Sequence, residues 1–199
     1  MMGRRSMRTA FISLGLALAL AGCGTTPKLD TFSLSAGQVA KTARSHKSMQ
    51  LLIQPPTALK ALDSENIVVN TAPGSIEYLG GAQWGDRLTN IVQARLVQSF
   101  ENSGLFGGIG RPGDGLAINY QVLTDLRVFG IRAYGGARTA VVDIAVRLMN
   151  DSSGEIRATR IFTATAPVRG TSNADYVRAL NTAFEQVSAE IVNWTAATL

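Results

Sequence analysis

The chain has 199 residues, 46% of them hydrophobic and 17% charged, with a formal net charge of +5. Three of its 19 lysines and arginines lie in the first 22 residues, which leaves 16 basic against 14 acidic side chains, a charge of +2, in the rest. Those charges are scattered and form no run of one sign, so the electrostatic footprint of a nucleic-acid-binding protein is absent. The rest of the chain has the length of one domain and can bury roughly 70% of its unfolded surface without disulfides or a metal ion.

The first 22 residues have the pattern of an export signal. Arg4, Arg5 and Arg8 form a basic start, and an apolar segment follows over residues 11–21. That segment is too short to span a hydrocarbon core of about 30 Å, which disfavours a transmembrane helix. The Arg4-Arg5 pair is also a feature of twin-arginine export signals, but the rest of the segment matches such a signal poorly. We expect residues 1–22 to be a signal peptide.

The residues that end this segment, Leu20, Ala21, Gly22 and Cys23, resemble the lipobox of bacterial lipoproteins. In that family the cysteine sulfur receives a diacylglycerol, the chain is cut before the cysteine, and the new amino terminus is acylated. The resemblance implies that Cys23 carries a covalent diacylglycerol and an N-acyl chain, with no other cofactor. Residues 23–30 would then be a short tether that keeps the domain close to the membrane.

Other roles for Cys23 fit the sequence less well. A disulfide has no second cysteine to use, because Cys23 is the only one. A catalytic nucleophile needs a base, and the only histidine, His46, lies in a polar stretch without a recognisable motif. A buried core cysteine is disfavoured by the Gly-Thr-Thr-Pro sequence that follows at once.

In chain order, short strands precede a helix in the first half of the domain. The alternating or β-branched runs that predict strands are residues 31–34, 49–53, 67–70 and 75–79, the last two as a hairpin. The polar residues 35–48 predict a surface loop. Apolar positions spaced by three and four predict a helix from Trp84 to Asn102, and Gly104 stands where a C-terminal cap is expected.

The second half begins with a glycine-dense stretch, residues 104–115, that predicts an exposed turn region. Longer strands are predicted at residues 117–129, 139–150 and 155–166, the last two joined by a turn that makes an antiparallel hairpin. A long helix is predicted over residues 173–197, capped by Ser172 or Asn173. Its continuous apolar stripe is more typical of a domain core than of a coiled-coil face for a partner.

These elements predict one α+β domain over residues 31–199. Its sheet is expected to be mixed or antiparallel, with about six or seven strands and the two amphipathic helices packed on it.

No catalytic or metal-binding pattern emerges, so the sequence predicts a protein that is not an enzyme. A Ser-His-Asp arrangement would depend on His46, and no Gly-x-Ser-x-Gly elbow occurs. Metal ligands are not clustered, and the glycines of residues 107–115 lack the Gly-Lys-Ser/Thr of a phosphate loop.

Apolar side chains on glycine-rich connections are candidates for contact with a partner. They are Leu105, Phe106, Phe129, Ile131 and Tyr134. Partial burial under the edge of the sheet is the alternative for the segment from Phe129 to Tyr134.

Several motifs carry a more specific resemblance. They are Leu62-Asp63, the run from Tyr78 to Leu88, Arg95-Leu96-Val97, Gly110 to Gly115, the run from Tyr120 to Phe129, Ser153-Gly154 before Arg160-Ile161-Phe162, and Ala183-Phe184 with Val192 and Trp194. Together they resemble the ABC-type transport auxiliary lipoprotein family over nearly the whole domain. Gly85 stands where that family usually has alanine, and Thr89 where proline is common.

The resemblance implies a non-catalytic component of an MCE-type ABC system that moves phospholipid or a related lipid between the inner and outer membranes. The protein would be its docking or receiving element, with an MCE-domain protein as partner and with homo-oligomers also implied. Gly24 follows the cysteine where aspartate retains many lipoproteins in the inner membrane, so the periplasmic face of the outer membrane is favoured. The alternatives are an assembly lipoprotein of the lipopolysaccharide-transport kind and, less favoured, a lipoprotein hydrolase.

Overall fold

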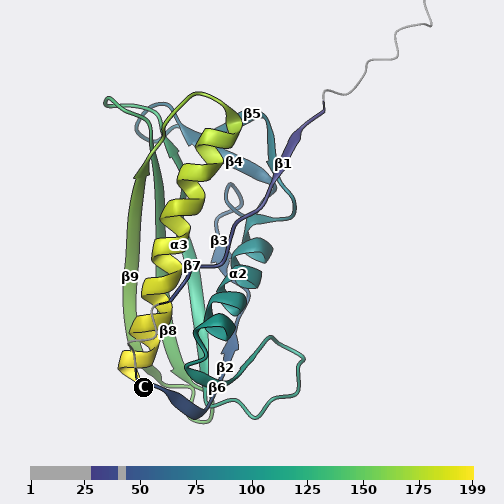
Figure 1. Ribbon diagram of the computed structural model, residues 1–199, viewed down its shortest axis with the longest axis vertical. Helices are drawn as coiled ribbons and strands as arrows, with labels where there is room; N and C mark the ends of the chain where they lie inside the picture. The colour runs from purple at the N-terminus through teal and green to yellow at the C-terminus, as the bar shows by residue number, and fades with distance from the viewer. Residues whose placement is uncertain (1–27, 40–43) are drawn as a thin grey trace, which may run out of the picture.

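The computed structural model describes residues 28–39 and 44–199, which form one mixed sheet and two helices (Figure 1). The strands are β1 (Asp30–Phe32), β2 (His46–Ile53), β3 (Thr57–Ala58), β4 (Asn66–Asn70), β5 (Glu77–Trp84), β6 (Phe106–Gly110), β7 (Tyr120–Arg132), β8 (Thr139–Asn150) and β9 (Ile156–Pro167). The helices are α2 (Leu88–Ser103) and α3 (Asn173–Thr198). The predicted α+β class is confirmed. The sheet has nine strands, more than the predicted six or seven, because short strands such as β3 and β6 lack a recognisable run.

Strand β7 is the centre of the sheet. One of its edges pairs with β8 in antiparallel fashion from Tyr120 to Arg132. Its other edge pairs in parallel with three short strands in succession: β2 at its start, β3 in its middle and β4 at its end. Strand β6 continues the sheet beyond β2, and β5 and then β1 continue it beyond β4. The predicted hairpins β4–β5 and β8–β9 are both present.

A β-bulge in β7 changes which face its side chains occupy. Leu126 pairs with Ile144 and Val128 with Asp143, so Arg127 is one residue more than the partner strand supplies. The bulge brings Arg127 and Val128 to the exposed face, while Leu126 before it and Phe129 after it are both buried beneath the helices. A strictly alternating strand could not bury both of these side chains on one face.

Both helices cover the same face of the sheet (Figure 1), α3 over β8 and β9 and α2 against β6. Helix α2 begins four residues later than predicted for a physical reason: Trp84 ends β5, where its amide donates to the carbonyl of Glu65 at 2.7 Å. Gly104 takes the predicted cap position with φ 60°. The apolar stripe of α3 is core, and the side chains at its centre, Leu180, Phe184 and Val187, are fully buried.

The segment after β1 is not the start of a surface loop, as its polarity predicts, but lies between the two helices (Figure 1). The amide of Ser35 donates to Asn181 on α3 at 2.7 Å, and the amide of Gly37 donates to Ser99 on α2 at 2.9 Å. Leu34, immediately before Ser35, is buried. The first residues of the domain therefore bridge α2 and α3.

Only part of the glycine-dense stretch after α2 is the exposed turn that was predicted: residues 111–115 are, whereas Phe106–Gly110 is strand β6. Gly107 lies in β6, where a Cβ atom would stand 2.1 Å from the backbone oxygen of Lys47 in β2. Gly130 in β7 similarly approaches the oxygen of Val68 in β4, at 2.8 Å from a Cβ atom. The prediction of exposed turns at these positions is wrong because glycine serves here to let two backbones approach closely.

We expect Gly107→Ala to destabilise the domain by about 1–3 kcal/mol or more, because its methyl group has no room against the backbone of β2. Gly80→Ala in β5 is the matched control, since a Cβ atom there meets nothing within 4 Å. Chemical denaturation of both variants measures the difference. Equal stability of the two variants would contradict the close pairing of β2 and β6.

Candidate functional site

The predicted lipidation site and its lipobox, Leu20 to Cys23, lie outside the described residues. The described chain begins at Lys28 and enters the domain through β1, at one edge of the sheet. Within residues 28–39 and 44–199, no helix is long and apolar enough to cross a membrane.

The exposure predicted for the candidate contact residues is wrong for four of the five. Leu105 and Phe106 are buried, and Phe129 and Ile131 are almost completely so. The ring of Phe129 packs between those of Trp84 and Phe184, with both centroid distances 6.0 Å. These four side chains belong to the core and are not available to a partner while the domain is folded.

These side chains are buried because β6 and β7 extend into two segments that were predicted, from their glycines, to be loops. Tyr134 alone lies on the loop between β7 and β8 and is partly exposed. Its role as a contact residue stays a prediction.

The only histidine has a structural contact. His46 Nε2 lies 2.8 Å from the carbonyl oxygen of Ala196 in α3, and the imidazole stacks on Phe106 with centroids 6.1 Å apart. In the part of the chain that the structure describes, no three His, Cys, Asp or Glu side chains come together as metal ligands. His46 thus joins the end of α3 to β2 and β6.

A pocket of about 160 Å³ with exposed apolar side chains lies on the face of the sheet opposite the helices. It is lined by Leu59, Ala61, Leu62, Val68, Asn70, Ile76 and residues Arg127 to Gly130. Leu59 is 79% exposed, Ile76 56% and Val128 40%, unusually high fractions for large apolar side chains grouped together. We refer to this group around Leu59, Ile76 and Val128 as the apolar pocket.

Two features of the fold create the apolar pocket. The bulge in β7 turns Val128 outward, and the segment after β3 brings Leu59 and Leu62 over Val68. Sequence analysis missed all three exposed residues. Leu59 had a usable signal, since it is a large apolar residue in a connection between two predicted strands. A bulge such as that before Val128 leaves no mark in the sequence.

Asp63 holds the connection beside the pocket. Its carboxylate accepts a hydrogen bond from Thr89 Oγ1 at 2.7 Å and forms an ion pair with Arg87. The Thr89 hydroxyl and then the Arg87 guanidinium lower the pKa of Asp63 below its ordinary value of 3.8. Because Leu88 also donates its amide to Ser64 at 3.0 Å, this connection is fixed to the start of α2. Asp63 and Arg87 are motif residues of the resemblance, and their role here is structural.

Exposed apolar side chains grouped on one face of a sheet are typical of a surface that binds a partner or a ligand. The model of the family described as "ABC-type transport auxiliary lipoprotein component" matches residues 32–192. The chain belongs to this family.

Individual relatives agree with this assignment. The uncharacterised protein bll6063 of Bradyrhizobium diazoefficiens is 29% identical over 179 residues, which cover 88% of this chain and 47% of that protein. The chain thus spans about half the length of this curated relative.

Among solved structures, protein XCC0632 of Xanthomonas campestris has a TM-score of 0.78 and 26% identity, with 84% of this chain and 95% of that chain covered. The hypothetical protein CT253 of Chlamydia trachomatis shares the fold, with a TM-score of 0.57 and 10% identity over 75% of this chain and 96% of that chain.

We expect Asp63→Asn to lower the free energy of unfolding at pH 7 by on the order of 1 kcal/mol, because the hydrogen bonds of the carboxylate are partly exposed. The pKa of Asp63 is lower in the folded than in the unfolded protein, where it is about 3.8. The carboxylate therefore contributes its full stabilisation at pH values above the unfolded pKa. This stabilisation is lost as the pH falls through the lower folded pKa, so the difference between variant and parent narrows in acid.

Denaturant titrations at pH 7 and at pH 3 measure this difference. Glu155→Gln is the control, since Glu155 is exposed in the β8–β9 turn. A constant difference across this pH range would contradict the role given to the Asp63 carboxylate.

Proposed function

We propose that this protein is a non-catalytic auxiliary lipoprotein of an MCE-type ABC transport system. It is anchored by acyl chains on Cys23 and serves as the docking or receiving component for phospholipid, or a related lipid, that moves between the inner and outer membranes. The MCE-domain protein is its partner, and the energy for transport comes from the ATPase of the system.

The observation that carries this proposal is the order of two features along the chain. A lipobox ends at Cys23, and the match to an ABC transport auxiliary lipoprotein family begins at residue 32. Gly24 behind the cysteine favours the outer membrane, with the domain on its periplasmic face. The tether between Cys23 and Asp30 then restricts the domain to within roughly 25 Å of that membrane, so the partner must come to it.

The apolar pocket supports the docking part of this proposal. Interface centres are apolar, well-packed patches, and a few large side chains usually supply most of the binding energy. The ion pair of Arg127 with Asp143, at 3.5 Å, adds charged groups beside Val128 and suits the polar rim of such a patch.

Anchoring is tested with Cys23→Ser in the native host. We expect the variant to retain residues 1–22 and to lose acylation, because the serine hydroxyl does not replace the thiol in forming the thioether to diacylglycerol. Mass spectrometry of the purified parent and variant measures both changes. A variant that is still cleaved and acylated would show that Cys23 is not the anchor.

Docking is tested by replacing Leu59 with a photo-crosslinking amino acid in cells. We expect it to capture an MCE-domain protein, because Leu59 is the most exposed side chain of the apolar pocket. The same replacement at Glu101, which is exposed on α2, is the control and should capture none.

Capture of a lipopolysaccharide-transport protein at position 59 would favour the alternative function instead. Capture of a second copy of this chain would assign the pocket to a homo-oligomer. No capture at position 59, or equal capture at both positions, would contradict docking through the apolar pocket.

A further inference from the structure

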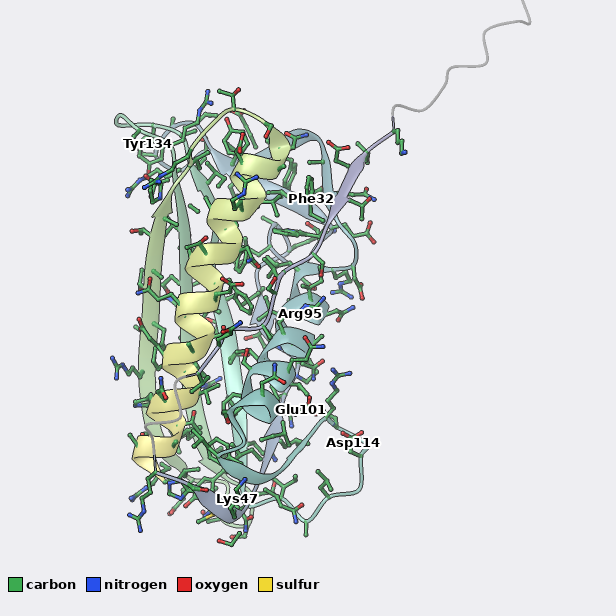
Figure 2. All side chains as sticks on the ribbon, viewed as in Figure 1. Phe32, Lys47, Arg95, Glu101, Asp114 and Tyr134 are labelled. Carbon is green, nitrogen blue, oxygen red and sulfur yellow. The ribbon has the colours of Figure 1, made fainter. Side chains whose placement is uncertain are left out.

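Three connections lie side by side at one end of the molecule. They are the β4–β5 turn (71–76), the β7–β8 loop (133–138) and the β9–α3 loop (168–172). The amide of Ala133 donates to Asn70 at 2.8 Å and that of Val168 to Arg138 at 3.0 Å, which joins the three. Figure 2 places Tyr134 at this end, and Lys47 and Asp114 at the other. We call the end with Tyr134 the entry end.

The chain enters the domain from the entry end. Strand β1 runs parallel to β5 with Asp30 opposite Ala82, so residues before Asp30 lead back toward the start of β5. The start of β5 pairs with the last residues of β4, which lie at the entry end. Cys23 precedes Lys28 by five residues, a reach of at most about 17 Å.

The entry end has more basic than acidic side chains. The basic residues are Lys28, Arg132, Arg138, Arg169 and Arg178, and the acidic residues are Asp30, Glu77 and Asp175. Arg178 pairs with Asp175 at 2.7 Å. Arg132, Arg138 and Arg169 form no ion pair with any residue that the structure describes.

Among the described residues at the opposite end, the charges of the side chains balance. The basic residues there are Arg44, Lys47, Arg111 and Arg157, and the acidic residues are Glu101, Asp114, Asp151 and Glu155. Among the described residues, a surplus of two basic side chains is thus found at the end at which the tether arrives and not at the other.

Apolar and aromatic side chains accompany these arginines. Ile76 is 56% exposed and Tyr78 is 49% exposed, and Tyr134 projects from a loop that contains Gly135 and Gly136. Beside Arg169, a depression of about 270 Å³ opens between the end of β9 and the first turns of α3. Arginines interspersed with tyrosines are typical of protein surfaces at the lipid headgroup layer.

We infer that the entry end rests on the surface of the membrane that holds the anchor. Arg132, Arg138 and Arg169 contact headgroup phosphates, and Tyr134 lies in the interfacial layer. The inference depends on the acylation of Cys23 in the proposed function. Since β7 has 13 residues, the opposite end projects roughly 40 Å from the bilayer. The apolar pocket then opens sideways, parallel to the membrane.

The full acylated protein, reconstituted in vesicles of phosphatidylethanolamine and phosphatidylglycerol, provides the test. Once Cys23 is consumed in the thioether, an introduced cysteine is the only free thiol, because the chain has one cysteine. Tyr134→Cys and Ser153→Cys, in the β8–β9 turn, are each labelled with a fluorophore. A quencher attached to the lipid headgroup then measures contact with the surface. We expect several-fold stronger quenching at position 134 than at position 153.

Charge reversal tests the arginines. Arg132→Glu with Arg169→Glu should reduce quenching at position 134 by half or more, and raising the salt from about 0.1 M to about 1 M should act in the same direction. Arg111→Glu with Arg157→Glu changes the net charge equally at the opposite end and should leave the quenching unchanged. Arg138 is kept because it lies over the ring of Tyr176, at 5.6 Å from the centroid.

Equal quenching at positions 134 and 153 would mean that the domain lies flat, and stronger quenching at position 153 would reverse the orientation. Weak quenching at both positions would place the entry end against something other than lipid. If both double variants weaken quenching equally, the protein is held by its overall charge and not by the arginines of the entry end. Each of these results overturns the inference. Mass spectrometry beforehand separates them from a failure of acylation, which would instead overturn the proposed function.

Discussion

Pairing along both edges of β7 is the constraint on which the rest of this structure depends. On one edge β8 provides a continuous antiparallel partner, and on the other β2, β3 and β4 fill the length in turn. β7 joins these strands into one sheet, from which β6 extends beyond β2, and β5 and β1 extend beyond β4. The helices then have a continuous apolar face to cover.

The same strand also shapes the outer face. Its bulge keeps Leu126 and Phe129 beneath the helices while Val128 is released to the other side. A single additional residue thus serves both the core and the apolar pocket. The connection after β3, which the hydrogen bond of Asp63 with Thr89 holds in place, adds Leu59 and Leu62 to the lining of the pocket.

Local patterns in the sequence predicted the elements that depend on local interactions. The β8–β9 hairpin and the capping of α3 by Ser172 are examples, since turn residues and the capping box act within a few positions of each other. The predictions failed where a partner distant in the chain decides the conformation. Gly107 and Gly130 are strand residues only because Lys47 and Val68 approach them, and four of the five candidate contact residues became core for the same reason. The lipobox is a local motif too, but its product is covalent chemistry, which the fold does not reveal.

The way in which the chain enters the domain has a mechanical consequence. Strand β1 lies along β5, and Ser35 and Gly37 after it are bonded to α3 and α2. A pull on the amino-terminal tether is therefore directed along β1, and its hydrogen bonds bear the force together, in shear, instead of breaking one after another. The carboxyl end of α3 lies at the far end of the molecule (Figure 1), and a pull there would peel the helix from the sheet turn by turn. Attachment through the first strand thus spreads a pull on the amino terminus over β5 and both helices.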